Sequence, residues 1–254
     1  MDLKTEFDAL ILQSVSNQYI QPNSFFYNYI YEEKLRKELS SRNLLEKFEE
    51  RELKEVSPGK IKMCSVASSS RLCLLYFANK TNTEFECSLG TGTRGIAQLD
   101  AFDGLKYYEC KCHEIFDKHD NYLRASYKAN LEKYLGLKNI NIEGNIIKLT
   151  LKGLEINDDR SIYSYHFDVK QFLCHLFGIA KKGGGNLQYI FFTPSNELIN
   201  KNSWCSEFYN NLDEEINNLW NSQKIQIMLK TCNIELPKPL KIQVSEIEDF
   251  ILVR

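Results

Sequence analysis

The sequence predicts an α/β protein: a mixed central sheet flanked by helices, with a helical extension at the N-terminus. Three segments support this class: a β-hairpin over residues 96–113, an amphipathic helix over 168–181 and a strand beginning at Leu187. Helices that alternate with strands in this way are typical of sheets covered by helices. With 254 residues, the chain is long enough to bury a substantial core.

The first 56 residues are expected to be helical. Phe7, Leu10 and Ile11 mark one short apolar face, and a longer segment after it mixes leucines with Glu, Lys and Arg. Ser57-Pro58-Gly59 interrupts this pattern, because Pro and Gly break helices. We therefore predict an N-terminal helical extension over 1–58 and a main domain over 59–254.

Beyond the hairpin, the periodicity of apolar residues predicts further elements. They are a helix over roughly 121–135, a strand-like stretch over 140–151, the helix over 168–181, the strand from Leu187, a helix over 204–219 and a last strand over 250–253. The helix over 168–181 has the clearest ends, since Asp168 precedes it as a cap and a run of three glycines follows it.

Asp103-Gly104 separates the two halves of the hairpin and is a strong signal for a two-residue turn. If these two residues form the loop, Phe102 faces Leu105 and Gln98 faces Glu109. Side chains alternate along a strand, so Asp100, Glu109 and Lys111 then lie on one face of the hairpin. Asp100 and Glu109 become diagonal neighbours, roughly 7–8 Å apart at the backbone.

Two carboxylates and a lysine on one face are suited to hydrolysis of a phosphodiester. Carboxylate oxygens bind Mg²⁺, with Mn²⁺ as a possible substitute, and the ion lowers the pKa of a bound water. A neighbouring lysine orients that water or stabilises charge that develops on the phosphate. Charged residues are also common on exposed hairpins, so this pattern alone does not define an active site.

The order of short motifs resembles a bacterial group of PD-(D/E)XK restriction-endonuclease-like proteins. The matching segments are the Ser68–Phe77 helix with its Ser-Ser-x-x-Leu-Cys pattern, Phe85-Glu86, the Gly90–Gly95 loop, Gln98-Leu99-Asp100, Glu109-Cys110-Lys111, the Gln171-x-x-x-His175 helix and the Leu187–Pro194 strand. The likeness spans Ser65 to Pro194, about half of the chain.

This resemblance implies a restriction-endonuclease-like αβββαβ core, a Mg²⁺ requirement and a DNA substrate. It implies that Asp100 and Glu109 bind the metal and that Lys111 is the catalytic lysine. The first core helix, residues 68–78, contains no acid, although many members of the group have a metal ligand there. Glu84 and Glu86, on the next strand, are the nearest acids. Glu86 has the better motif match and is the candidate third ligand, or else a surface residue of its strand. Gln171 resembles a glutamine that lines the site in RecB-like nucleases, or is a polar position of an amphipathic helix.

Residues 90–95 spell Gly-x-Gly-x-x-Gly, the pattern of dinucleotide-binding loops. That mechanism needs a helix after the glycines, whereas here a strand is predicted, so we exclude a nucleotide cofactor. We instead expect Thr93 and Arg94 in this loop, together with Gln98 and Gln171, to contact the substrate backbone.

Composition limits the class of protein. The net charge is −2, so any contact with nucleic acid must come from a local basic patch. The eight cysteines contain no Cys-x-x-Cys pair. Neither a signal peptide nor a membrane-spanning run is evident. Together these observations indicate a cytoplasmic protein with free thiols. A homodimer is a reasonable expectation, because cores of this kind often need two sites to cut both strands. The alternatives are a non-catalytic binding module with the same fold, or a nuclease directed to RNA.

Overall fold

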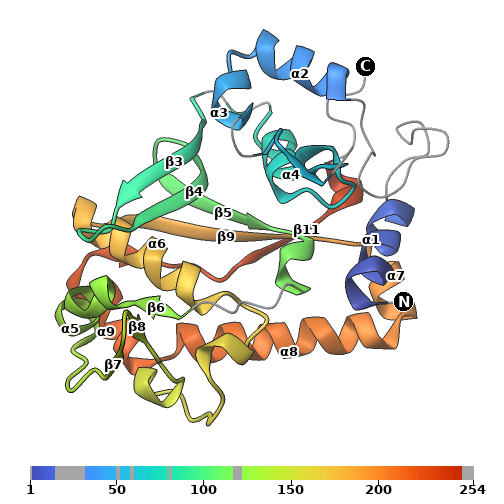
Figure 1. Cartoon of the computed structure of the whole chain (residues 1–254). Helices are drawn as coiled ribbons and strands as arrows, with labels where there is room; N and C mark the ends of the chain where they lie inside the picture. Colours follow the sequence, from blue (N-terminus) through green and yellow to red (C-terminus); the bar gives the residue numbers. More distant parts are fainter. Residues whose placement is uncertain are drawn as a thin grey trace.

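The computed structural model describes residues 2–14, 32–49, 52–57, 60–78, 80, 82–116 and 122–247. A curled mixed sheet forms its centre (Figure 1), and its strands follow the spatial order β10-β9-β5-β4-β3. Their bounds are β3 Glu84–Gly90, β4 Ile96–Phe102, β5 Lys106–Lys111, β9 Gly185–Thr193 and β10 Ile234–Glu235. A further strand, β11 (Leu240–Gln243), also pairs with β9. The predicted α/β class with a mixed sheet is confirmed.

Antiparallel and parallel pairing meet at β5. β3, β4 and β5 form an antiparallel meander, and β9 then pairs with β5 in parallel, after a long connection that contains α6 (Val169–Lys182). α4 (Ser69–Tyr76) lies on one face of the sheet and α6 on the other (Figure 1). Both faces of β5 are therefore covered by helix, which explains why its central residues are buried.

The other described helices and strands are α1 Leu3–Ser14, α2 Glu32–Ser41, α3 Leu45–Glu49, β1 Glu55–Ser57, β2 Lys60–Ile61, β6 Leu123–Arg124, α5 Lys128–Leu135, β7 Ile142–Glu143, β8 Ile146–Ile147, α7 Asn196–Lys201, α8 Ser203–Trp220 and α9 Gln223–Thr231. Among the helices described here, none has the length and apolar character needed to cross a membrane. All eight cysteines belong to described segments and carry free thiols.

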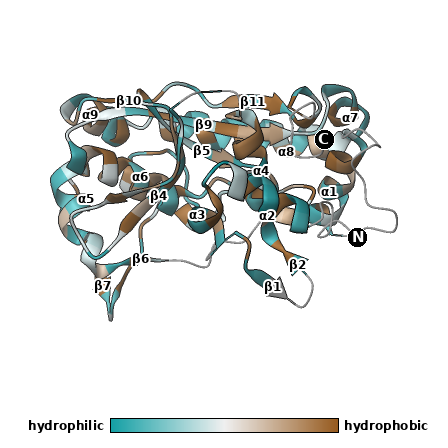
Figure 2. Ribbon diagram, turned by 90° about the horizontal axis from the view of Figure 1, so that it is seen from above, coloured by the Kyte–Doolittle hydropathy of each residue, from teal (hydrophilic) through white to brown (hydrophobic). Residues whose placement is uncertain are grey.

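The N-terminal helices pack against the sheet domain. Buried residues of α1, α2 and α3, among them Phe7, Leu39 and Phe48, belong to the same hydrophobic cluster as β5 and β9. The ring of Phe7 lies 4.9 Å from that of Phe116, in the 3₁₀ turn that follows β5. In Figure 2, β9 is mostly hydrophobic whereas α2 is largely hydrophilic, so α2 contributes to the core with few residues. The predicted domain boundary at residues 58 and 59 lies outside the described residues.

Several predicted elements are confirmed and others differ. α6 begins after Asp168, whose carboxylate accepts a hydrogen bond from the backbone of Gln171, and ends at Gly183 with φ +105°. The helix predicted over 121–135 begins only at Lys128, because the preceding residues pair with β8 as β6 and then form a 3₁₀ turn. The stretch over 140–151 contains only the short hairpin β7–β8. The strand predicted over 250–253 lies outside the described residues.

The β4–β5 hairpin forms with a different register from the predicted one. Phe102 pairs with Tyr107, two residues beyond the expected Leu105, and Gly104 is the first central residue of the turn, with φ +91°. The cause is Asp103, whose carboxylate accepts hydrogen bonds from the N–H groups of Leu105 and Lys106. The N–H of Asp103 donates to the carbonyl oxygen of Lys106, so these two residues flank the turn and the loop is Gly104-Leu105. Because the shift is by two residues, the alternation of faces is unchanged.

Candidate active site

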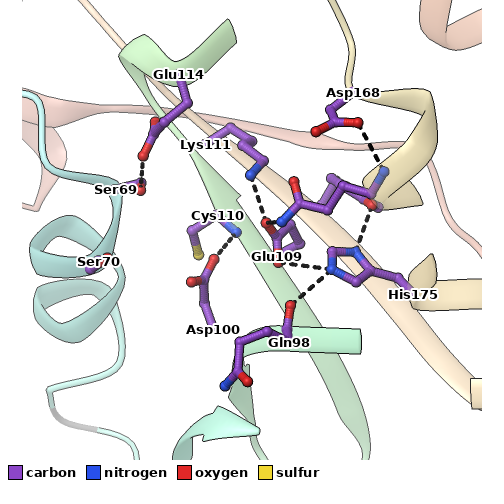
Figure 3. Close-up of polar contacts among 12 residues, drawn as sticks. Ser69, Ser70, Gln98, Asp100, Glu109, Cys110, Lys111, Glu114, Asp168 and His175 are labelled. Carbon is purple, nitrogen blue, oxygen red and sulfur yellow. Dashed lines mark hydrogen bonds and ion pairs between the residues drawn. The ribbon is translucent and has the colours of Figure 1, made fainter. Parts of the chain in front are cut away.

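The candidate site lies where β4 and β5 stop pairing backbone to backbone. The paired residues end at Ala101 and Tyr108. Beyond this pair, the N–H of Cys110 donates to the carboxylate of Asp100 at 2.6 Å instead of to a carbonyl group. The side chain of Asp100 therefore fills the gap between the two strands, beside the end of β5. Figure 3 shows Asp100, Glu109 and Lys111 gathered between α4 and α6.

Glu109 and Lys111 form a buried ion pair at this point. Lys111 Nζ lies 2.7 Å from Glu109 Oε1, and the two side chains are 16 % and 3 % exposed. The same Oε1 atom accepts a hydrogen bond from Gln171 Nε2 at 2.9 Å, and His175 Nε2 lies 3.5 Å from Oε2. Glu109 is thus held from β5 and from α6 at once, so its orientation is well defined.

Burial dominates the electrostatics of the two predicted acids. It raises the pKa of Asp100 well above its ordinary value, and the charge of Glu109 adds to this effect while Lys111 opposes it. It also raises the pKa of Glu109, although Lys111 counteracts the rise. Burial disfavours the charge of Lys111 too, but attraction to Glu109, Glu114 and Asp100 is stronger and raises its pKa. Two carboxyls that resist ionisation, one buried and one half-buried, are a donor set that a divalent cation would stabilise.

His175 supports Glu109 as a neutral imidazole. Burial, together with the nearby charge of Lys111, lowers its pKa to about 3. Nε2 lies 2.8 Å from the carbonyl oxygen of Gln98, which can only accept, so this nitrogen carries the proton. Nδ1 then accepts from the hydroxyl of Tyr189 at 2.9 Å. This tautomer directs an N–H group toward Gln98 and Glu109.

Glu114 is a site residue that the sequence reasoning missed. It follows β5 in a 3₁₀ turn and accepts hydrogen bonds from Ser69 Oγ of α4 and, at 2.9 Å, from the N–H of Cys112. Burial works against its ionisation, but His113, Lys111 and the Ser69 bond outweigh burial and lower its pKa. The available signal was the pair of serines at the start of α4, which are hydroxyl donors in a helix that has no acid.

The second of these serines also binds a carboxylate. Ser70 Oγ donates to Glu52 at 2.7 Å, and Lys62 Nζ lies 2.9 Å from the other oxygen of the same carboxylate. α4 contains no acid of its own, but two carboxylates lie at its N-terminal turn. Glu52 precedes the helix in the chain and Glu114 follows it. His113, by contrast, is directed away, since its ring contacts Asp8 of α1 at 3.1 Å.

Glu86 lies on β3 at a position with φ +53°, between two paired residues of the β3–β4 ladder. Its carboxylate is within 3.4 Å of Gln98 Nε2. Burial is the main reason why the pKa of the Cys73 thiol is raised, and the charges of Asp100, Glu86 and Glu109 all add to that rise. The three predicted acids therefore all add negative charge to the surroundings of one thiol in α4.

A cavity of about 520 Å³ adjoins the acids on the α6 side. Its wall consists of Arg94, Gly95, Ile96, Ala97, Gln98, Arg124, Tyr127, Asp168, Lys170, Gln171, Cys174 and His175. Three of the four predicted substrate-binding residues, Arg94, Gln98 and Gln171, are brought together here. Thr93 is not, because its hydroxyl bonds to Thr91 and accepts from the N–H of Gly95 within the loop. Asp100, Glu109 and Lys111 are not in the wall either.

Asp100 and Glu109 together could hold Mg²⁺, which typically binds through one or two carboxylates and keeps several waters. In the described part of the chain, the structure contains no cluster of three or more His, Cys, Asp or Glu side chains arranged as a metal site. The glycine-rich loop 90–95 joins β3 to β4, so a strand follows it, as predicted, and the dinucleotide reading is excluded.

Comparison of the chain with models of protein families, with characterised proteins and with solved structures gives no match. The contacts of the site itself are therefore the basis on which a function can be assigned. Those contacts join residues from five parts of the chain: α4, β4, β5, the 3₁₀ turn after β5, and α6.

Proposed function

We propose that the chain is a Mg²⁺-dependent nuclease that hydrolyses DNA phosphodiester bonds on a restriction-endonuclease-like core. The observation that carries this proposal is the convergence of Asp100, Glu109 and Lys111 at the opened end of the β4–β5 hairpin, with Lys111 Nζ 2.7 Å from Glu109. The order of α4, β3, β4, β5, α6 and β9 supports the proposal, since it follows the αβββαβ order that the resemblance implies when β6, α5, β7 and β8, which lie between β5 and α6, are set aside as an insertion.

Each residue has a role in this proposal. Asp100 and Glu109 would hold the metal, with Glu86 as a third acid. The ion, when bound, supplies a water of lowered pKa and neutralises charge on the phosphate. Lys111 positions that water or stabilises the developing negative charge. Gln171 and His175 fix the orientation of Glu109 through Oε1 and Oε2.

A second candidate, a non-catalytic binding module with the same fold, is favoured by one observation. Glu109 Oε1 is already engaged by Lys111 and Gln171, as in an ion pair whose role is structural. A nuclease that acts on RNA uses the same chemistry. We also propose a homodimer, as the resemblance implies, and a reducing cytoplasm, in which eight free thiols are stable.

The test is cleavage of mixed single- and double-stranded DNA in Mg²⁺, Mn²⁺ or EDTA by the wild type, Asp100→Ala and Lys111→Ala. Lys241→Ala, which breaks the Lys241–Asp213 ion pair at the surface, is the matched control. Cutting that requires metal, is lost in both site variants and persists in the control supports the nuclease. No cutting of DNA or RNA by the wild type, with DNA binding unchanged in both site variants, supports the binding module.

A further inference from the structure

Three cations line the cavity beside the acids, and they come from separate segments. Arg94 is in the loop between β3 and β4, Arg124 is in β6, and Lys170 is in the first turn of α6. Within the described parts of the chain, the structure gives none of the three an ion pair. Unpaired cations gathered in one cavity of a chain with net charge −2 form a local site for anions.

The cavity shares part of its wall with the shell of Glu109. Gln171 Nε2 donates to Glu109 at 2.9 Å, and His175 lies 3.5 Å from the same carboxylate. Both side chains also line the cavity. A group bound there is therefore separated from Glu109 by a single layer of side chains, which is the position expected for a substrate unit next to the reacting one.

The size and surface of the cavity limit what can enter it. Its volume of about 520 Å³ is in the range of roughly 300–1,000 Å³ that holds one small-molecule-sized group. A base-paired duplex is far larger than such a pocket. Ile96 in the wall is 62 % exposed and offers an apolar surface to a base or sugar. Asp168 is the one carboxylate of the wall, and its Oδ1 accepts from the N–H of Gln171.

We propose that this cavity binds one nucleotide of a single-stranded segment of the nucleic acid, adjacent to the phosphodiester that is cleaved. Arg94, Arg124 and Lys170 contact its flanking phosphates, for which guanidinium and ammonium groups are well suited. This inference deepens the proposed nuclease function and depends on it, since the neighbouring acids define where cleavage occurs.

The test is binding of fluorescently labelled single-stranded DNA and RNA oligonucleotides, measured by anisotropy at several salt concentrations in EDTA, so that no cleavage occurs. The test protein is the triple variant Arg94→Ala/Arg124→Ala/Lys170→Ala. Lys230→Ala, at an exposed lysine of α9, is the control. Thermal melts of all variants establish that they are folded.

Three lost phosphate contacts should make the negative slope of log K against log salt shallower by about 2 and weaken binding about 100-fold at 0.1 M salt. The control should bind as the wild type does, and a blunt duplex should bind more weakly than a single strand. The inference is overturned if the triple variant keeps the wild-type slope, or if the blunt duplex binds as tightly as the single strand. The DNA and RNA arms identify which strand is preferred.

The two proposals fail in different ways. If the wild type cuts nucleic acid and the triple variant cuts and binds equally well, the cavity assignment is wrong and the nuclease assignment stands. If the wild type cuts nothing while single-strand binding depends on the three cations, the cavity binds nucleic acid and the nuclease assignment is wrong.

Discussion

Replacing Lys111 with methionine should destabilise the fold far more than breaking a surface ion pair of similar length. At the 2.7 Å separation of Lys111 Nζ and Glu109 Oε1, the attraction is about 6 kcal/mol for an effective dielectric constant of about 20. Part of this is offset by the desolvation that both groups undergo, and removing one partner of a buried pair typically costs about 3–5 kcal/mol. Glu109 keeps its hydrogen bond from Gln171, so we expect about 3 kcal/mol.

The control is Lys241→Met. Lys241 lies 2.6 Å from Asp213, but the two side chains are 39 % and 45 % exposed, so the expected cost is below about 1 kcal/mol. Urea unfolding at neutral pH measures both variants. A double variant with Glu109→Gln should recover part of the loss, because no carboxylate is then left unpaired. If Lys111→Met costs no more than Lys241→Met, the pair is not buried as described and the reasoning is wrong.

Three other predictions follow from the same contacts. In the folded chain, Asp100 and Glu109 have pKa values above the ordinary 3.8 and 4.5. Between the unfolded and the folded pKa values, the folded chain therefore binds more protons than the unfolded chain, and it loses stability as pH rises through this range. Asp100→Asn should be more stable than wild type in urea at pH 8 in EDTA, with an advantage that shrinks toward pH 4. The His175 imidazole, with its pKa near 3, should show no titration between pH 5 and 8 by NMR, and a midpoint near 6.5 would contradict its burial. Gly95→Ala should lower the free energy of unfolding by about 1–3 kcal/mol, because the new Cβ would lie 1.9 Å from the Tyr127 hydroxyl. Adding Tyr127→Phe to this variant should partly restore the melting temperature. A Gly95→Ala protein with an unchanged melting temperature would refute the close approach.

Local sequence signals predicted the elements that carry the site. Alternation identified β4 and β5, and the Asp168 cap and the glycine run fixed the ends of α6. The hairpin register was wrong, because Asp-Gly is compatible with two positions of the turn and the carboxylate of Asp103 decides between them. The faces were nevertheless right, since a shift of two residues preserves alternation.

Contacts between distant segments were beyond the reach of these signals. Glu114 meets Ser69 across 45 residues of sequence, after a 3₁₀ turn that ends the strand periodicity. The ring of His113, two residues after Lys111, contacts Asp8 of α1, which lies 105 residues earlier in the chain. Arg124 joins the cavity from a two-residue strand that is too short to leave a periodic pattern. Such positions depend on how the connection between β5 and α6 folds back over the sheet.

The most direct test of the central claim is Mg²⁺-dependent cleavage of labelled DNA by the wild type and Asp100→Asn. Asparagine keeps an oxygen that can accept the Cys110 N–H and removes the charge that burial disfavours, so the variant should remain folded. A loss of activity then cannot be attributed to unfolding. The proposal predicts products with wild type and Mg²⁺, and none with the folded variant. Equal cleavage by both proteins would contradict a catalytic role for Asp100 and the site proposed around it.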